Sequence, residues 1–120
     1  MTEKISKDDI TDILNIVLCI SAKDGVLSDI ELEKARVEFP KFFGRKVSNK
    51  KMESVLDDFF SSTKQIEDYL DAISNDELKK PILLLSILSA SADGFDIREN
   101  IAYQKSLLIW GYDHKEIHSD

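Results

Sequence analysis

Apolar residues recur through this chain at the three- and four-residue spacing of an amphipathic α-helix. Near the start, Ile10, Ile13, Leu14, Val17 and Leu18 fall at positions i, i+3, i+4, i+7 and i+8. Such a stripe gathers apolar side chains on one helix face, which is stable only when it is buried against other elements. Later segments repeat the pattern, with apolar positions at Leu32, Ala35, Phe39; Met52, Val55, Leu56, Phe59, Phe60; Ile66, Tyr69, Leu70 and Ile73.

Helix start and stop signals divide these stripes into about seven helices. Ser6, Ser28 and Ser48 are predicted N-caps, because a serine hydroxyl accepts a hydrogen bond from a free N–H of the first turn. We expect the second helix to end at Pro40 and the sixth near Gly111. Further helix starts are predicted at Thr63, at Ser74 with Glu77, at Asp96 with Glu99, and at Asp113 with Glu116.

Length and composition agree with a helical domain. The chain has 120 residues, of which 42% are hydrophobic, so one domain with its own core over residues 1–120 is expected. Only 4 glycines and 2 prolines are present, which leaves few turns for a fold of many short strands. We therefore predict an all-α, single-domain bundle of about seven helices, with short connections between antiparallel neighbours.

One turn occurs twice. The segment "CISAKDGVLSDIELEKA" (19–35) is echoed by "LSASADGFDIRENIAYQ" (88–104), and aligning the two Asp-Gly pairs gives an offset of 69 residues. The same offset places Leu14 over Leu83 and Leu18 over Ile87. Two helix-turn-helix units related by a pseudo-twofold axis would explain the echo. In that arrangement the first helix packs against the fifth.

At these residues the chain resembles the TerB-like domains of bacterial tellurite-resistance systems. The resemblance lies in the two Asp-Gly turns and in the closing "LLIWGYDHKEI", and it covers residues 10 to 117. It implies a bundle of about seven helices and a role in stress response or tellurite resistance without enzymatic activity. It also implies that acidic residues bind a divalent metal and that the domain works beside membrane partners.

The family's acidic positions match Asp24 and Glu31 in the first unit and Asp93 in the second. Glu99 lies one position short of the first unit's spacing, where Asn100 is the matching residue. With Asp96 on the same turn, these acids form the candidate metal site, which comprises Asp24, Glu31, Asp93, Asp96 and Glu99. Ca²⁺ or Mg²⁺ is the favoured ion, because both prefer oxygen ligands.

The same acids have a second explanation as turn and cap residues. An Asp side chain can accept a hydrogen bond from the backbone two residues on, and Glu31 or Glu99 can cap a helix. An EF-hand is excluded, because aligning its invariant glycine with Gly25 puts Ile20 and Ala22 at ligand positions. The sequence leaves the metal-binding and the capping explanations open.

Net charge and cysteine content limit the kinds of partner and the cellular compartment that we expect. The net charge of −7 repels phosphate, so we expect no nucleic-acid partner and no bulk attraction to anionic lipid. The single cysteine, Cys19, cannot form an internal disulfide. The apolar stretch at 82–92 is too short to span a bilayer, and the charged N-terminus is not a signal peptide. A cytoplasmic location is expected, at the inner membrane face where a membrane-associated partner is bound.

Two further features have ordinary explanations. The basic segment "KFFGRKVSNKK" (41–51) is expected to be a loop with two core aromatic residues, and its alternative is a patch for a membrane surface or an acidic partner. His114 and His118 have a spacing that can hold zinc, but a structural zinc site requires four ligands.

Taken together, the sequence favours a non-enzymatic TerB-like domain that binds a divalent cation through its acidic turns and docks onto a partner protein. The alternative is a purely protein-binding helical module whose acids are helix caps. A third hypothesis, a metal-dependent hydrolase or nuclease, has no general base near the acids to support it. The oligomeric state is not predicted.

Overall fold

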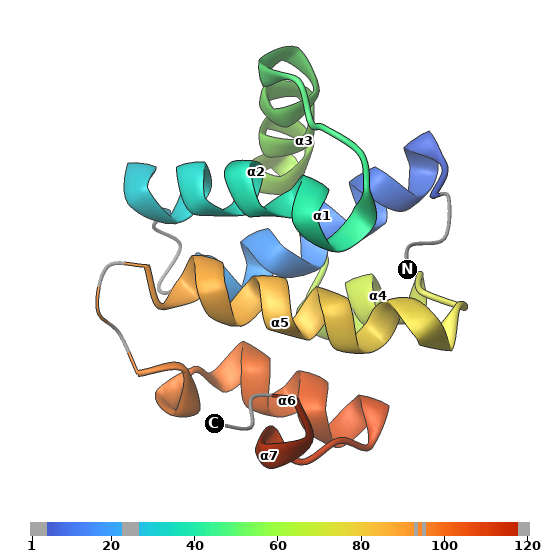
Figure 1. Cartoon of the computed structure of the whole chain (residues 1–120), viewed down its shortest axis with the longest axis vertical. Coiled ribbons are helices and arrows are strands. Elements are labelled where there is room, and N and C mark those ends of the chain that lie inside the picture. Colours follow the sequence, from blue (N-terminus) through green and yellow to red (C-terminus); the bar gives the residue numbers. More distant parts are fainter. Residues whose placement is uncertain (1–4, 23–26, 93, 95, 118–120) are drawn as a thin grey trace.

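Seven α-helices and two short 3₁₀ helices make up the computed structural model, which describes residues 5–22, 27–92, 94 and 96–117 (Figure 1). No strand occurs among these residues, so the predicted all-α bundle is confirmed. The α-helices are α1 (Lys7–Ser21), α2 (Asp29–Phe43), α3 (Asn49–Ser61), α4 (Ile66–Asp71), α5 (Lys79–Ala90), α6 (Ile101–Trp110) and α7 (His114–Ile117). The 3₁₀ helices are η2 (Asp76–Leu78) and η3 (Ile97–Glu99).

Helices α1 and α5 form the centre of the molecule. They pack against each other, as the repeat predicts, and α5 also contacts α2 on one side and α6 and α7 on the other (Figure 1). Helix α4 contacts both α1 and α6, and α3 packs against α1. The two central helices therefore bring the first and second halves of the chain into one body.

The core follows from the apolar stripes. Ile13, Leu14, Val17 and Leu18 of α1 have no exposed surface, and Ile10 is 5% exposed. Helix α5 contributes side chains that are equally enclosed, among them Ile82, Leu83 and Leu85. A helix that is apolar on most sides is stable only in the interior, which is where both of these helices lie.

The predicted caps of the first three helices are confirmed. The hydroxyl of Ser6 accepts a hydrogen bond from the N–H of Asp9, and that of Ser48 accepts one from Lys51. The hydroxyl of Ser28 accepts one from the N–H of Glu31, as the capping box requires. Each contact satisfies an N–H that the helix itself leaves without a partner.

The predicted end of the second helix at Pro40 is wrong. Helix α2 continues to Phe43 and ends at Gly44, which has a φ of 71°. The rings of Phe39 and Phe43, one turn apart, are both buried with centroids 4.8 Å apart. This packing holds the last turn in place. The helix therefore continues past Pro40, although Pro40 has no backbone N–H to donate. The basic segment is therefore a loop only in its middle, between α2 and α3.

Three other local predictions are also corrected. Phe60 is 54% exposed, because α3 packs on α1 through Met52 and Val55 instead. Helix α4 begins at Ile66 and not at Thr63. The capping box predicted at Ser74 and Glu77 for the fifth helix is absent: Asn75 caps η2 by accepting a hydrogen bond from the N–H of Glu77 at 3.0 Å, and α5 begins at Lys79.

Within the described residues, none of the helices combines the length and the apolar character needed to cross a membrane.

Candidate functional site

Two of the five predicted metal-site residues, Asp24 and Asp93, lie outside the described residues. Glu31 is described and is only 2% exposed. Its carboxylate accepts a hydrogen bond from the backbone N–H of Ser28 at 3.1 Å, which completes the capping box at the start of α2. Glu31 is therefore a cap of α2 whatever else it binds.

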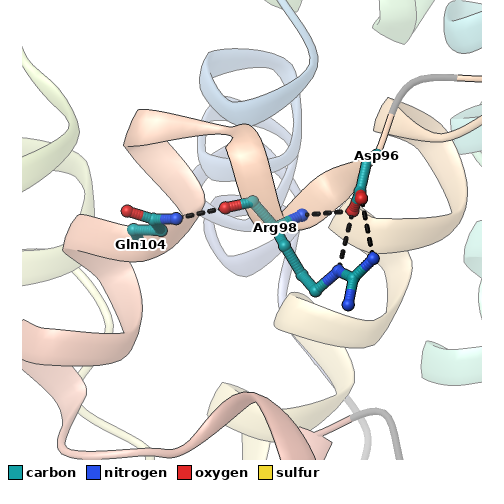
Figure 2. Close-up of polar contacts among 3 residues, drawn as sticks. All are labelled: Asp96, Arg98 and Gln104. Atoms are coloured by element: carbon teal, nitrogen blue, oxygen red, sulfur yellow. Dashed lines mark hydrogen bonds and ion pairs between the residues drawn. The ribbon is translucent and has the colours of Figure 1, made fainter.

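Asp96 forms a local pair with Arg98, as Figure 2 shows. Its Oδ1 accepts hydrogen bonds from the backbone N–H and the Nε of Arg98, both at 3.0 Å. Its Oδ2 accepts a third from the guanidinium at 2.8 Å. These bonds to Arg98 lower the pKa of the Asp96 carboxyl to about 2. The side-chain amide of Gln104 donates to the carbonyl of Arg98 and ties this pair to α6 (Figure 2).

The predicted capping of the sixth helix by Asp96 and Glu99 is wrong. Asp96 is the N-cap of η3 and Glu99 is its last residue, whereas the N-cap of α6 is Asn100. The Oδ1 of Asn100 accepts a hydrogen bond from the N–H of Tyr103 at 2.9 Å. Asn100 is the N-cap because its side chain is buried, at 6% exposure, and makes a second polar contact there. The Glu99 side chain is exposed.

Within the described residues three hydrogen bonds join the repeated units, and the second contact of Asn100 is one of the two that end on a backbone carbonyl. The Nδ2 of Asn100 donates to the carbonyl of Ile20 at 2.7 Å. The hydroxyl of Ser89 donates to the carbonyl of Glu31 at 2.8 Å. Asn100 and Glu31 are 100 − 31 = 69 residues apart, and Ser89 and Ile20 are 89 − 20 = 69 residues apart. The two bonds thus join equivalent positions under the offset of the repeat.

A cleft of about 390 Å³ lies between α1, α4 and the start of α6. We call it the Cys19 cleft. Its apolar lining includes Ile20, Ile66 and Ala102, and Lys105 and the predicted site residue Glu99 are among its polar groups. Burial raises the pKa of the Cys19 thiol to about 11. The thiol is therefore protonated at neutral pH, which makes it a poor nucleophile.

A second concave surface of about 500 Å³ runs along the outside of α2 to the end of α5. We call it the α2 groove, lined by Asp29, Ile30, Glu33, Lys34, Val37, Glu38 and Ala92. Ile30 is 58% exposed and Val37 is 45% exposed. These two residues are seven positions apart and out of phase with the buried Ala35 and Phe39. This second apolar pair is visible in the sequence, although the predicted apolar stripe of the helix does not include it.

The part of the chain that the structure describes contains no group of three or more His, Cys, Asp or Glu residues placed to hold a metal ion. The predicted five-residue metal site stays a prediction, because Asp24 and Asp93 are outside that part. The same holds for the histidine pair, of which His114 is described and His118 is not. Comparison of the chain with protein-family models, with curated proteins and with solved structures found no match.

Proposed function

We propose that this chain is a helical protein-interaction module that binds an amphipathic helix of a partner protein in the α2 groove. The observation that carries the proposal is the exposure of Ile30 and Val37 along this groove. Exposed apolar side chains in a concave surface are typical of helix-in-groove recognition. The carboxylates of Glu31 and Asp96 already accept backbone hydrogen bonds, which supports a capping role for Glu31 at α2 and for Asp96 at η3.

The charges at the groove indicate the chemistry of the partner. Asp29, Glu33 and Glu38 contribute three acids to its lining, and Lys34 contributes one base. Glu33 pairs with Arg36, and Glu38 pairs with Lys34 and Lys41, so a cationic partner competes with these pairs for two of the acids. The chain as a whole has a net charge of −7, which speeds association with a cationic partner. We therefore propose a partner helix that presents apolar side chains at i, i+4 and i+7 between flanking Lys or Arg residues.

Two synthetic amphipathic peptides with the same apolar face test this proposal, one flanked by lysines and the other by glutamates. Titration into ¹⁵N-labelled protein is expected to shift amide signals of residues 29–38 and Ala92 with the lysine peptide only. The affinity should fall as salt is added. Val37→Glu should weaken binding by at least roughly tenfold, since it puts a charge in the apolar centre. Leu108→Glu on α6 is the matched control and should bind as the parent does. Equal binding of both peptides, or shifts that map elsewhere, would overturn the proposal.

A second candidate function is the binding of a divalent cation by a TerB-like stress-response domain. One observation favours it: Ala22, next to the first acidic turn in sequence, lines the Cys19 cleft together with Glu99 of the second unit. The motifs around Asp24 and Asp93 give the TerB-like assignment its basis. In this proposal the domain is cytoplasmic and works beside a membrane-associated partner, with Ca²⁺ or Mg²⁺ as the favoured ion.

Thermal unfolding with and without Ca²⁺, Mg²⁺, Mn²⁺ and Zn²⁺ tests the second candidate. A cation site predicts a metal-dependent rise in melting temperature, because a ligand that binds only the folded state stabilises it. The rise should disappear in the double variant Asp24→Asn, Asp93→Asn, and NMR shifts should cluster at residues 22–31 and 91–100. Asp57→Asn on α3 is the control and should keep the metal response. Unchanged melting with every ion would count against a cation site.

A further inference from the structure

Helix α6 is rich in apolar residues, yet it buries few of them. Among its apolar side chains only Tyr103 is buried. Ile101 is 72% exposed, Leu108 is 83% exposed and Ile109 is 50% exposed. Isolated exposed apolar residues are common on protein surfaces, whereas a group of them on one helix marks an interaction site.

The exposed residues share one face of the helix. Ile101, Lys105 and Leu108 stand at i, i+4 and i+7, the spacing that brings side chains together along a helix. Ser106 and Tyr103 are buried and lie on the opposite face, against the bundle. The face formed by Ile101, Lys105, Leu108 and Ile109 is called the outer α6 face below.

We propose that the outer α6 face binds a second copy of this chain, with the two α6 helices packed antiparallel about a twofold axis. Ile101 and Leu108 lie at equal distances in sequence from the midpoint between Gln104 and Lys105. Antiparallel pairing about that midpoint sets Ile101 of each copy against Leu108 of the other. The same pairing sets Lys105 against Gln104, so no like charges are directly opposed. A twofold interface has to be self-complementary in this way.

Charge distinguishes a second copy from other occupants. Two chains that each carry a net charge of −7 repel each other, and this repulsion is weakest where acids are absent. Of the seven α-helices in the described residues, only α5 and α6 contain no Asp or Glu, and α5 lies in the interior. The single charge on the face, Lys105, lies 3.5 Å from Glu67, so it already has a counter-ion when the helices meet. Helix α6 thus adds no acid of its own to a twofold contact, and the exposed acid that lies beside the face, Glu67, is paired with Lys105.

Sedimentation of the full chain over a roughly hundredfold range of concentration tests the proposal. We expect a reversible monomer–dimer equilibrium. Leu108→Glu should weaken it by at least roughly tenfold, because it buries an acid without a partner. Val37→Glu in the α2 groove is the matched control: it should weaken peptide binding by at least roughly tenfold and leave the dimer intact. Failure of the peptide experiment therefore leaves this proposal standing. A chain that stays monomeric at every concentration, or a dimer unaffected by Leu108→Glu, would overturn it.

Cysteine cross-linking tests the orientation of the helices and does not depend on how well Leu108→Glu folds. In a Cys19→Ala background, Lys105→Cys should form disulfide-linked dimers under mild oxidation, since the two positions face each other near the axis. Ile101→Cys should not, because antiparallel packing separates the two copies of that position by about 10 Å along the helix. Cross-linking at position 101 without cross-linking at position 105 would overturn the antiparallel arrangement.

Discussion

The side-chain amide of Asn100 donates a 2.7 Å hydrogen bond to the backbone carbonyl of Ile20, which lies in the last turn of α1. The same side chain caps α6 through its Oδ1. One buried polar side chain thus bonds two backbone groups, one in each half of the chain. Because burial without a hydrogen bond is costly, the side chain fixes how the second unit sits on the first.

Replacing Asn100 with alanine is expected to destabilise the fold by about 2–4 kcal/mol. Loss of an N-cap costs about 1 kcal/mol, and a buried carbonyl left without a partner costs about 1–3 kcal/mol. Urea denaturation followed by circular dichroism measures the change. Asn100→Ser is the control, since serine keeps the cap and cannot reach Ile20, and it should lose only the second part. A loss below about 1 kcal/mol for the alanine variant would show that neither bond matters.

Ser89 is the middle of a buried chain of hydrogen bonds, and its removal should cost more than removal of the end residue. The hydroxyl of Ser21 donates to Ser89 at 2.8 Å, and Ser89 donates to the carbonyl of Glu31 at 2.8 Å. Ser89→Ala removes the acceptor of the Ser21 hydroxyl and a donor to the Glu31 carbonyl, and should destabilise the fold by about 1–3 kcal/mol. Ser21→Ala leaves the bond to Glu31 in place and should cost about 1 kcal/mol or less. Equal costs in the same denaturation assay would contradict this order.

These contacts show which parts of the molecule the sequence can reveal. Ser28 and Glu31 are three residues apart, so their capping box is a local pattern that can be read directly. Asn100 looks no better a cap than Asp96 or Glu99 until α1 places a carbonyl beside it, and that carbonyl is 80 residues away in sequence. The failure at Pro40 has the same cause, because the packing of Phe39 and Phe43 in the core decides where α2 ends.

The candidate binding surfaces also divide into features that are visible in the sequence and features that depend on tertiary packing. The outward direction of Ile101 and Leu108 depends on which face of α6 meets the bundle, and that is a tertiary fact. The apolar content of α6 favoured burial, so sequence patterning alone would have placed these residues in the core. The Asp-Gly turns, by contrast, are visible in the sequence. Whether they bind a cation is tested by the thermal unfolding experiment with divalent ions.

Gly111 ends α6 in a left-handed conformation, with a φ of 76°, and its N–H donates to the carbonyl of Leu107 at 2.8 Å. A β-carbon added at this position would meet no atom within 4 Å. Gly111→Ala should therefore destabilise the fold by backbone strain alone, by about 1–2 kcal/mol. Gly111→Asn should cost less, because asparagine tolerates this conformation better. Thermal melting of the two variants checks the order, and a larger loss for asparagine would contradict it.

Alkaline pH should destabilise the protein through two groups that are neutral when protonated, the partly buried Cys19 thiol and the buried Tyr103 phenol. Burial raises the pKa of the Cys19 thiol from 9.0 to about 11 and that of the Tyr103 phenol from 10.0 to about 12. As pH rises, the unfolded chain releases these protons first, so it binds fewer protons than the folded chain and stability falls. The contribution of both groups is complete below about pH 9 and is lost by about pH 12.

Urea denaturation at a series of pH values between about 8 and 12 checks this prediction. Cys19→Ala should move the onset of the decline from about pH 9 to about pH 10, because only the Tyr103 phenol then remains. Tyr103→Phe should flatten the upper part of the decline and leave its onset unchanged. A stability curve that stays level across this range in the parent protein would mean that neither group is protected from ionisation in the folded state.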